Sequence, residues 1–379
     1  MAINKEAAEV YKSLGVRPAI TASGATTMYG GSKLRPEVYD VMNKASSVMV
    51  NIDELNVKAG QEIANMIGAE AAMITSGSGG GLILQAAACI AGSDPAKMSM
   101  LPDTTGMKNE IIIHKSHRFA YDQLYRAAGA ELVDIGDALR VHPWMLENAI
   151  NENTAAVAYL HCNFVSRRAL PLKTVVEIAH SRNVPVIVDA ASTLPPRSNF
   201  TKHIEEGADL VQFSGGKGVR GPQGTGILLG KKEFVEAAYA NASPHQFIGR
   251  GMKVAKEEII GLVEALRIFL DEDENQQMQR YQKMCEKVLD AFVEVPGLKV
   301  EIKHDEFDYL VPTVVFTFTK EWTGLGRDAV LQSMEDEDPR IFLWQLGNPD
   351  EIGIEPLNLD QGELDIVIEK LRTKLINID

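Results

Sequence analysis

The sequence contains little cysteine. Only three cysteines occur in 379 residues, at positions Cys89, Cys162 and Cys285. Three widely separated thiols are too few for a disulfide framework or a zinc cage. We therefore expect reduced, mostly buried thiols, as is usual in a cytoplasmic protein, and no metal site.

The sequence also lacks a long apolar run. A membrane-spanning helix needs roughly 18 consecutive apolar residues, and the longest run here, residues 82–91, is interrupted by Gln85. The first residues, MAINKEAAEVYKSLGV, are charged and amphipathic and contain no signal-peptide core. We therefore expect a cytoplasmic protein without a membrane partner.

Positive charge is scarce as well. Lys and Arg number 38 against 52 Asp and Glu, which gives a net charge of -14. Proteins that bind nucleic acids usually present a basic face, so we expect no nucleic-acid partner, although a local basic patch stays open. The remaining composition, 45% hydrophobic and 24% charged, is typical of a globular protein. At roughly one to two hundred residues per domain, the length predicts two or three domains.

Seven short apolar runs alternate with helix-like segments from residue 70 onward. Strands that read as continuous apolar runs are buried on both faces, and alternation with helices is typical of parallel crossovers. The sequence therefore predicts a three-layer α/β domain around a mainly parallel seven-stranded sheet. The runs are AAMITS (71–76), EIIIHK (110–115), ELVDIG (131–136), AAVAYL (155–160), PVIVDA (185–190), LVQFSG (210–215) and TGILLG (225–230).

Three parts of the chain are predicted: an N-terminal arm (1–50), the large domain (51–253) and a smaller α+β domain (254–379). The arm contains ITASGATTMYGGSKLRPEV, which leaves little room for a regular element and indicates a linker or a surface loop. The small domain begins with a long helical pattern that is interrupted by the acidic and uncapped DEDENQQ. Strand-like runs (LKVEIKHD, TVVFTFTK, IFLWQL, IGIEPLNL) and a closing helix follow.

The candidate chemistry lies where the strands end, because open α/β sheets bind ligands beyond the carboxyl ends of their strands. GSGGGL (77–82) follows the first run and opens a helix, so it is either an anion-binding cup or a tight turn. Asp189 ends the run PVIVD, where a partly buried carboxylate needs a cation, unless it only caps a helix.

Lys217 lies in the Gly-rich loop GKGVRGPQG between the last two runs. A nucleotide-binding P-loop would have Ser or Thr after this lysine, but Gly218 is found there; an ordinary surface-loop lysine is the other alternative. Taken in order, the cup, the carboxylate and the lysine fit pyridoxal 5'-phosphate. Its phosphate needs an anion cup, its pyridine nitrogen a carboxylate and its aldehyde a lysine.

On these residues the chain resembles the fold-type I pyridoxal-phosphate enzymes of the selenocysteine-synthase-like group, and within it the D-glucosaminate-6-phosphate ammonia-lyases. The resemblance implies an aspartate-aminotransferase-like large domain and an α+β C-terminal domain. It covers nearly the whole chain and is carried by ITASGATTMYGGSKL, TSGSGGGLIL, NEIIIHKSHRFAYDQLYRAAGAELVDIG, VPVIVDAAS, QFSGGKGVRGPQGTGILLG and IGRGMKVAKEEI.

The resemblance also implies roles for individual residues. Lys217 resembles the lysine that forms a Schiff base with the cofactor, and Asp189 the partner of its ring nitrogen. His117 takes the place from which a side chain stacks on the cofactor ring, although it could be a polar loop histidine. The other implied cofactor ligands are Ser76, Gly77, Ser78, Gly79 and Ser214 for the phosphate, Asn163 for the phenolic oxygen, and Gly224 and Thr225 for the phosphate of the neighbouring subunit.

Further residues are implied to contact the substrate. Arg250 and Lys253 are candidates for an anionic substrate group, or else form a basic helix start. Tyr29, Ser32 and Lys33 on the arm are expected to cover the site of a partner chain. These assignments imply a small-molecule amino acid substrate and a homodimer or larger homo-oligomer with composite active sites.

The implied reaction is α,β-elimination on a 2-amino-3-hydroxy acid, with D-glucosaminate 6-phosphate as one candidate, to a 2-keto acid and ammonia. Lys217 would remove the α-proton, and His117 or a water would protonate the leaving hydroxyl. An aldolase, a selenocysteine-synthase-like β-replacement enzyme, an aminotransferase and a non-catalytic cofactor- or phosphate-binding protein remain alternatives. The short arm, compared with bacterial selenocysteine synthase, and the negative charge argue against an aminoacyl-tRNA substrate.

Overall fold

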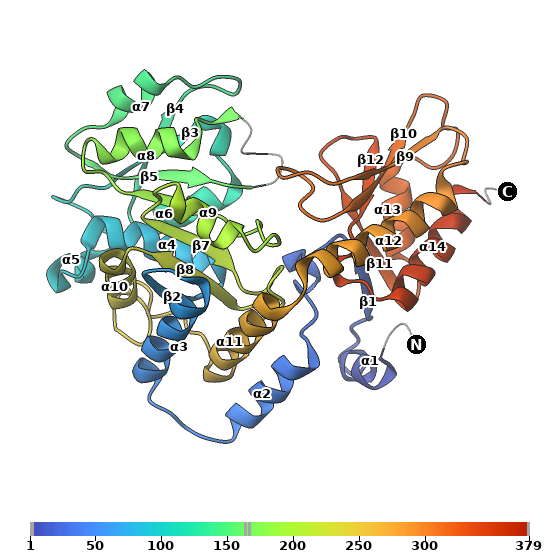
Figure 1. Ribbon diagram of the computed structural model, residues 1–379, viewed down its shortest axis with the longest axis horizontal. Coiled ribbons are helices and arrows are strands. Elements are labelled where there is room, and N and C mark those ends of the chain that lie inside the picture. Colours follow the sequence, from blue (N-terminus) through green and yellow to red (C-terminus); the bar gives the residue numbers. More distant parts are fainter. Residues whose placement is uncertain (1–3, 163–164, 166–167, 377–379) are drawn as a thin grey trace. The chain divides into compact units, whose positions relative to one another are not determined.

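The computed structural model describes residues 4–162, 165 and 168–376. The chain divides into two compact units (Figure 1). The large unit comprises residues 34–271, and the small unit comprises residues 1–33 and 272–379. The domain boundaries after residues 50 and 253 therefore stay a prediction, whereas contacts within the chain separate the units after residues 33 and 271.

The large unit is built around a seven-stranded sheet with the order β2-β8-β7-β6-β5-β3-β4. The five strands from β7 to β4 run parallel, and β8 is antiparallel to both of its neighbours. This confirms the predicted mainly parallel sheet, and each predicted run coincides with a strand. The strands are β2 (Ala71–Ser76), β3 (Glu110–His114), β4 (Glu131–Ile135), β5 (Thr154–Leu160), β6 (Val186–Asp189), β7 (Leu210–Ser214) and β8 (Thr225–Gly230).

Helices cover both faces of this sheet, as its burial requires. In β6 the side chains of Val186 and Val188 enter the core on one face, and Ile187 enters the core on the other. Burying each such side chain contributes about 1.5–3 kcal/mol. One face is covered by α4 (Gly77–Ala91), α5 (Pro95–Met100), α6 (Gln123–Ala127) and α10 (Lys232–Asn241); the other is covered by α2 (Pro36–Ser46), α3 (Ile52–Ile67), α7 (Pro143–Ala149), α8 (Leu172–His180), α9 (Asn199–Glu205) and α11 (Lys256–Asp271).

The small unit contains a five-stranded sheet with the order β1-β11-β12-β10-β9, and its helices pack on one face. Its core includes Phe292 and Phe316, whose rings meet edge to face at 5.3 Å. Its elements are α1 (Lys5–Lys12), β1 (Ala19–Ala22), η1 (Thr27–Tyr29), α12 (Glu274–Phe292), β9 (Leu298–Lys303), β10 (Thr313–Phe318), α13 (Arg327–Glu335), β11 (Arg340–Gln345), β12 (Glu351–Ile354), η5 (Pro356–Asn358) and α14 (Gln361–Leu375).

Two expectations about local structure were wrong. The arm does contain a strand, because β1 pairs in parallel with β11 and buries Ile20 and Ala22 completely. The acidic stretch before α12 is also capped: the side chain of Asp273 accepts a hydrogen bond from the backbone N of Gln276 at 3.0 Å. This cap ends the long helical pattern at α11 and starts α12.

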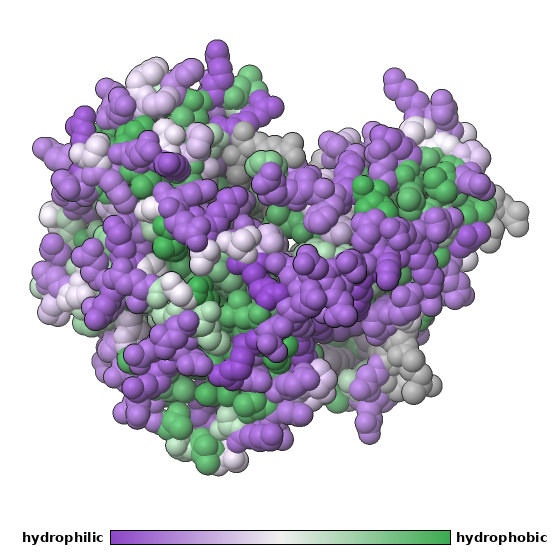
Figure 2. Space-filling model, in the orientation of Figure 1, coloured by the Kyte–Doolittle hydropathy of each residue, from purple (hydrophilic) through white to green (hydrophobic). Residues whose placement is uncertain are grey.

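Among the helices of the described residues, none combines the length and the apolar character needed to cross a bilayer. The face of the molecule drawn in Figure 2 is largely hydrophilic. Within residues 4–162, 165 and 168–376 the three cysteines form no disulfide bond, and no group of His, Cys, Asp and Glu there is placed to hold a metal ion.

Candidate active site

The ends of five strands bring most of the predicted site residues to one edge of the large sheet. Ser76, Asp189 and Ser214 are the last residues of β2, β6 and β7. Because β8 runs antiparallel, its first residue, Thr225, lies at the same edge, opposite Ser76. His117 follows β3 within the short helix η2 (Lys115–His117). In open α/β sheets, ligands bind at the carboxyl ends of the parallel strands, which lie at this edge.

Asp189 and Lys217 influence each other electrostatically. Asp189 is 7% exposed, and one of its oxygens accepts a hydrogen bond from the backbone N of Ala191 at 3.0 Å. Burial raises the pKa of Asp189, while the Ala191 bond and the charge of Lys217 lower it. Burial lowers the pKa of the half-buried Lys217, while the charges of Asp189 and Cys162 raise it. The structure therefore places the predicted base and the predicted ring partner in one electrostatic environment.

The loop that carries Lys217 is tightly built. The backbone N of Gly221 donates to the carbonyl of Gly215 at 2.8 Å, so the loop closes on itself. At Gly218 a Cβ atom would lie 2.1 Å from the carbonyl oxygen of Leu194, which no side chain tolerates. The run of glycines after β7 therefore reflects close backbone packing, and this packing fixes the base of the lysine side chain.

The predicted anion cup lies at the start of α4. Gly77 has φ +61°, and its N–H donates to the carbonyl of Gly224 at 2.7 Å. The N–H of Gly77 is thus engaged within the protein. The N–H groups of Ser78 and Gly79 lie in the first helical turn, where no intrahelical acceptor exists and the helix dipole favours an anion. Among the cup residues, Ser78 and Gly79 therefore offer the free backbone donors.

A small pocket is lined by both His117 and Asp189, and its lining does not include Lys217 or the serines and glycines of the cup. His117 is 1% exposed, so it is not an exposed loop histidine. Its Nδ1 accepts a hydrogen bond from the backbone N of Leu160 at 3.1 Å. The ring proton of the neutral histidine is therefore on Nε2. The ring of Tyr159 meets the His117 ring edge-on at 4.7 Å and holds its orientation.

Gly224 and Thr225 are engaged within their own loop. Thr225 is fully buried, and its hydroxyl donates to the carbonyl of Pro222 at 2.6 Å. Gly224 accepts the hydrogen bond from Gly77. A role of these two residues at a neighbouring subunit stays a prediction. Asn163 lies outside the described residues.

Arg250 and Lys253 are exposed and flank Met252. Met252 packs against the first turn of α4, because a Cβ atom at Gly80 would lie 3.6 Å from its sulfur. In the described part of the chain, neither cation forms a side-chain hydrogen bond or ion pair. The segment that carries these two cations therefore contacts the first turns of α4 through Met252.

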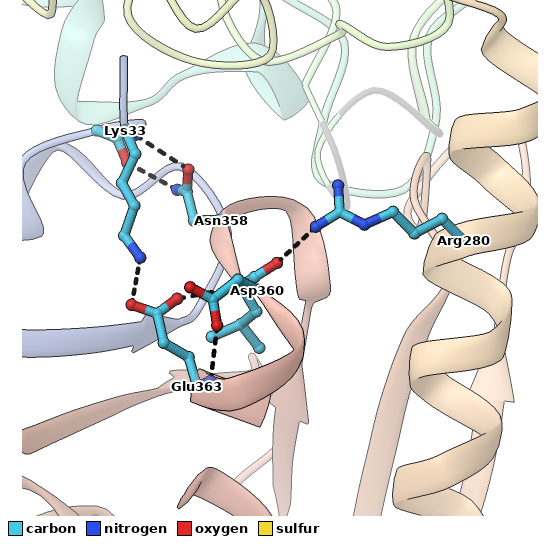
Figure 3. A network of polar contacts seen from close by, with 7 residues as sticks. Lys33, Arg280, Asn358, Asp360 and Glu363 are labelled. Atoms are coloured by element: carbon cyan, nitrogen blue, oxygen red, sulfur yellow. Dashed lines mark hydrogen bonds and ion pairs between the residues drawn. The ribbon is translucent and has the colours of Figure 1, made fainter. Parts of the chain in front are cut away.

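The three arm residues lie in the small unit, where Figure 3 shows the contacts of Lys33. The Lys33 ammonium pairs with Glu363 at the start of α14, and its backbone N donates to the side chain of Asn358 at 3.3 Å. The ring of Tyr29 stacks on Phe342 at 3.7 Å, and Ser32 is half-buried. Within each unit taken by itself, these residues are therefore not grouped with Asp189 and Lys217.

Sequence reasoning missed an aromatic wall of the pocket. Tyr125 is 3% exposed and lines the pocket with Asp189. Burial raises the pKa of Tyr125, and the charge of Asp189 raises it further, so the phenol stays protonated. The signal available in the sequence was the aromatic spacing in HRFAYDQLY, directly after the predicted stacking histidine.

Comparisons with known proteins agree with this arrangement. Residues 27–294 match the family described as SelA, L-seryl-tRNA selenium transferase. The chain is 30% identical over 372 residues to D-glucosaminate-6-phosphate ammonia lyase of Salmonella typhimurium, covering 96% of this chain and 97% of that protein. It is 29% identical over 378 residues to 5'-C-glycyluridine monooxygenase-decarboxylase of a Streptomyces species, covering 97% and 92%. A solved structure of D-glucosaminate-6-phosphate ammonia-lyase superposes with a TM-score of 0.84 at 28% identity, covering 100% of this chain and 99% of that one.

Proposed function

Since the chain belongs to the SelA family, we propose that it eliminates water from a 2-amino-3-hydroxy acid, after which hydrolysis of the resulting enamine releases ammonia and leaves a 2-keto acid. The chain has the fold of the fold-type I pyridoxal-phosphate enzymes, its cofactor is pyridoxal 5'-phosphate, and it is a lyase. The observation that carries the proposal is the grouping of Asp189, Lys217 and the start of α4 at one sheet edge.

The residues at this edge fit the cofactor. Asp189 is a buried carboxylate that accepts one hydrogen bond among the described residues, from Ala191, and a second oxygen is left for a cationic ring nitrogen. Ser78 and Gly79 would bind the phosphate with their backbone donors, and Ser76 and Ser214 would add hydroxyls. Lys217 would bind the aldehyde carbon. When bound, the cofactor supplies an electron sink for a carbanion next to its imine.

Lys217 is suited to move the α-proton. Burial favours the neutral amine, which is the form that accepts a proton. The Asp189 charge acts in the opposite direction but is the smaller effect, so the net shift of the lysine pKa is downward. His117 presents a ring with its proton on Nε2 in the pocket that Asp189 also lines. It would donate a hydrogen bond to the β-hydroxyl, and a water would supply the proton with which this hydroxyl leaves.

Charge near the cup supports an acidic substrate. Arg250 and Lys253 flank the segment that packs on the first turn of α4, and both are exposed. They would bind the carboxylate or phosphate of the substrate, for which D-glucosaminate 6-phosphate is a candidate. Tyr29, Ser32 and Lys33 would approach from a partner subunit, in a homodimer or a larger homo-oligomer.

A different bond cleavage is the second candidate. The monooxygenase-decarboxylase relative is 29% identical over nearly the full chain, almost as similar as the ammonia lyase. The same lysine and aspartate support loss of other groups from the α-carbon. Release of ammonia favours elimination, release of carbon dioxide favours decarboxylation, and release of an aldehyde without ammonia favours aldol cleavage. A requirement for a second nucleophile favours β-replacement.

The test starts with the absorption spectrum of the purified protein. We expect a visible band from bound pyridoxal phosphate that borohydride bleaches, with the added mass mapped to Lys217. Screening 2-amino-3-hydroxy acids should then give equal amounts of ammonia and keto acid. A protein that stays colourless after addition of the cofactor contradicts the catalytic proposal and favours a non-catalytic phosphate-binding protein. Cofactor on Lys217 without any ammonia release contradicts the elimination alone.

A further inference from the structure

Three buried polar side chains lie beneath the predicted cofactor site. Gln85 and Gln212 are completely buried, and Thr75 is 1% exposed. Gln85 lies on α4, whereas Thr75 and Gln212 lie on β2 and β7. A buried amide is costly unless it is hydrogen-bonded. We therefore expect each of these buried polar side chains to form hydrogen bonds that hold specific elements of the large unit together.

A chain of hydrogen bonds connects Gln212 to the start of α4. The Gln212 side-chain amide donates to the Thr75 hydroxyl at 3.1 Å, and that hydroxyl donates to the carbonyl of Gly77 at 2.8 Å. The same amide donates to the carbonyl of Phe213 at 2.6 Å. Gly77 is the first residue of α4, so the chain ends at the predicted phosphate cup.

The other end of this chain lies beside Asp189. Gln212 is the register partner of Asp189 across β6 and β7, and the carbonyl of Gln212 accepts the N–H of Ala190 at 2.9 Å. From the helix, the side chain of Gln85 donates to the carbonyl of Val188 at 3.1 Å. The Gln85 amide thus fastens the strand that carries Asp189 to the helix that starts at the cup. The Gln212 amide connects the neighbouring strand β7 to the same helix start through Thr75.

The helix is shaped to admit the Gln212 amide. A Cβ atom at Gly81 would lie 1.7 Å from Oε1 of Gln212, so only glycine leaves space there. Gly81 is therefore required by packing against Gln212 and not by the phosphate. The side-chain oxygens of Gln85 and Gln212 have no hydrogen-bond partner within the described residues. Burying these two oxygens without a partner costs stability. The two glutamines therefore contribute through the hydrogen bonds that their side-chain nitrogens donate.

We propose that Gln212, acting through Thr75, is a positioning residue for the cofactor. The bond chain sets the distance between the start of α4 and Asp189, which bind opposite ends of the cofactor under the proposed function. The inference rests on that function. Gln212 contacts neither the substrate nor the cofactor in this proposal; it acts by fixing the two elements that do.

The test compares Gln212→Met and Thr75→Val with a matched control, Asn241→Leu. Asn241 is also completely buried, donates from its side chain to the carbonyls of Gly92 (3.0 Å) and Ala237 (2.9 Å), and has an unpaired side-chain oxygen among the described residues. It fastens the far end of α4, away from the cup. Each variant is stripped of cofactor and titrated with pyridoxal phosphate, and its melting temperature and absorption maximum are recorded.

We expect all three variants to melt at lower temperature, because each loses a buried hydrogen bond. Only Gln212→Met and Thr75→Val should bind the cofactor more weakly, by about tenfold or more, and shift its absorption maximum. Thr75→Ser keeps the hydroxyl and should restore both properties. The double variant should lose little more affinity than either single variant, because both changes break one chain.

Three results would overturn the inference. They are wild-type affinity in both Gln212→Met and Thr75→Val, an equal loss of affinity in Asn241→Leu, or no rescue by Thr75→Ser. If Gln212→Met does not fold, the comparison of Thr75→Val with Thr75→Ser decides the test. Failure of the proposed function looks different, because the wild-type protein itself would then bind no cofactor on Lys217.

Discussion

At the scale of single residues, the site depends on two charged side chains, Asp189 and Lys217, whose pKa values burial shifts in opposite directions. Burial raises the pKa of Asp189 and lowers that of Lys217, so each is pushed toward its neutral form. Their mutual attraction opposes this tendency. A cationic ring nitrogen beside Asp189 would complete the balance by keeping the carboxylate ionised.

Asp189→Asn tests this balance. The amide keeps the size of the side chain and the hydrogen bond from Ala191 but cannot carry a negative charge. We expect weaker cofactor binding and a kcat lower by about 10²–10⁴-fold, because the ring nitrogen loses its anionic partner. Steady-state kinetics at saturating cofactor measure the effect. Unchanged kinetics would mean that Asp189 serves only as a cap for the following turn.

Glu355 gives a pH-dependent prediction. Its half-buried carboxyl packs against Gly24, and burial raises its pKa to about 7. Between the unfolded value of 4.5 and about 7, the folded protein binds more protons than the unfolded chain. Its contribution is therefore fully present below the lower value and is lost as the pH rises through the upper one. Glu355→Gln should stabilise the protein above pH 7 and leave it unchanged at pH 4.5.

Melting temperatures across this pH range measure the effect, and Glu337→Gln is the control. Lys374 and Lys370 lower the pKa of Glu337, so this carboxylate stabilises the fold at neutral pH and loses its effect as the pH falls. Its replacement should destabilise at pH 7, opposite in sign to Glu355→Gln. If Glu355→Gln has the same effect at every pH, the carboxyl does not titrate in this range.

At the scale of elements, the strands of the large sheet were predictable because they are buried on both faces and read as continuous apolar runs. Strand β1 could not be found in this way. Only Ile20 and Ala22 face the core, and its partner β11 lies more than 300 positions later in the chain. Its pairing is decided by tertiary structure, which a four-residue strand does not encode locally.

The residues of the site also divide into those that the sequence predicts and those that it does not. Asp189 and Lys217 could be predicted as site residues because Asp189 ends an apolar run and Lys217 lies two residues after another. The link from Gln212 through Thr75 could not, because it depends on β2 and β7 lying on either side of β8. A polar residue within an apolar run was the only available signal, and it does not reveal a partner.

Gly81→Ala tests the packing of α4 on the sheet. Alanine is the better helix former by about 1 kcal/mol, yet its Cβ would overlap the Gln212 amide at 1.7 Å. Overpacking costs about 1–3 kcal/mol, so we expect a net loss of stability. Urea unfolding measures the loss. Adding Gln212→Ser should recover part of it by removing the obstacle, and no recovery would place the conflict elsewhere in the helix.

At the scale of the whole molecule, the remaining question is where the arm acts. Tyr29 stacks on Phe342 and Lys33 pairs with Glu363, so these two arm residues are held within the small unit of their own chain. Lys217 belongs to the large unit. If subunits share their sites, as we propose, Tyr29 of one chain completes the site that contains Lys217 of another.

Co-expression of Lys217→Ala with Tyr29→Ala tests this sharing. Each variant alone should be nearly inactive. A mixed dimer carries both defects in one site and leaves the other site intact. With random pairing, half of the dimers are mixed, so roughly a quarter of all sites should recover activity. Differently tagged chains allow the mixed dimer to be isolated and assayed. A mixed dimer without activity would mean that each arm serves its own subunit, and Tyr29→Phe, which keeps the ring stack, would then separate the loss of the hydroxyl from the loss of the arm's anchor.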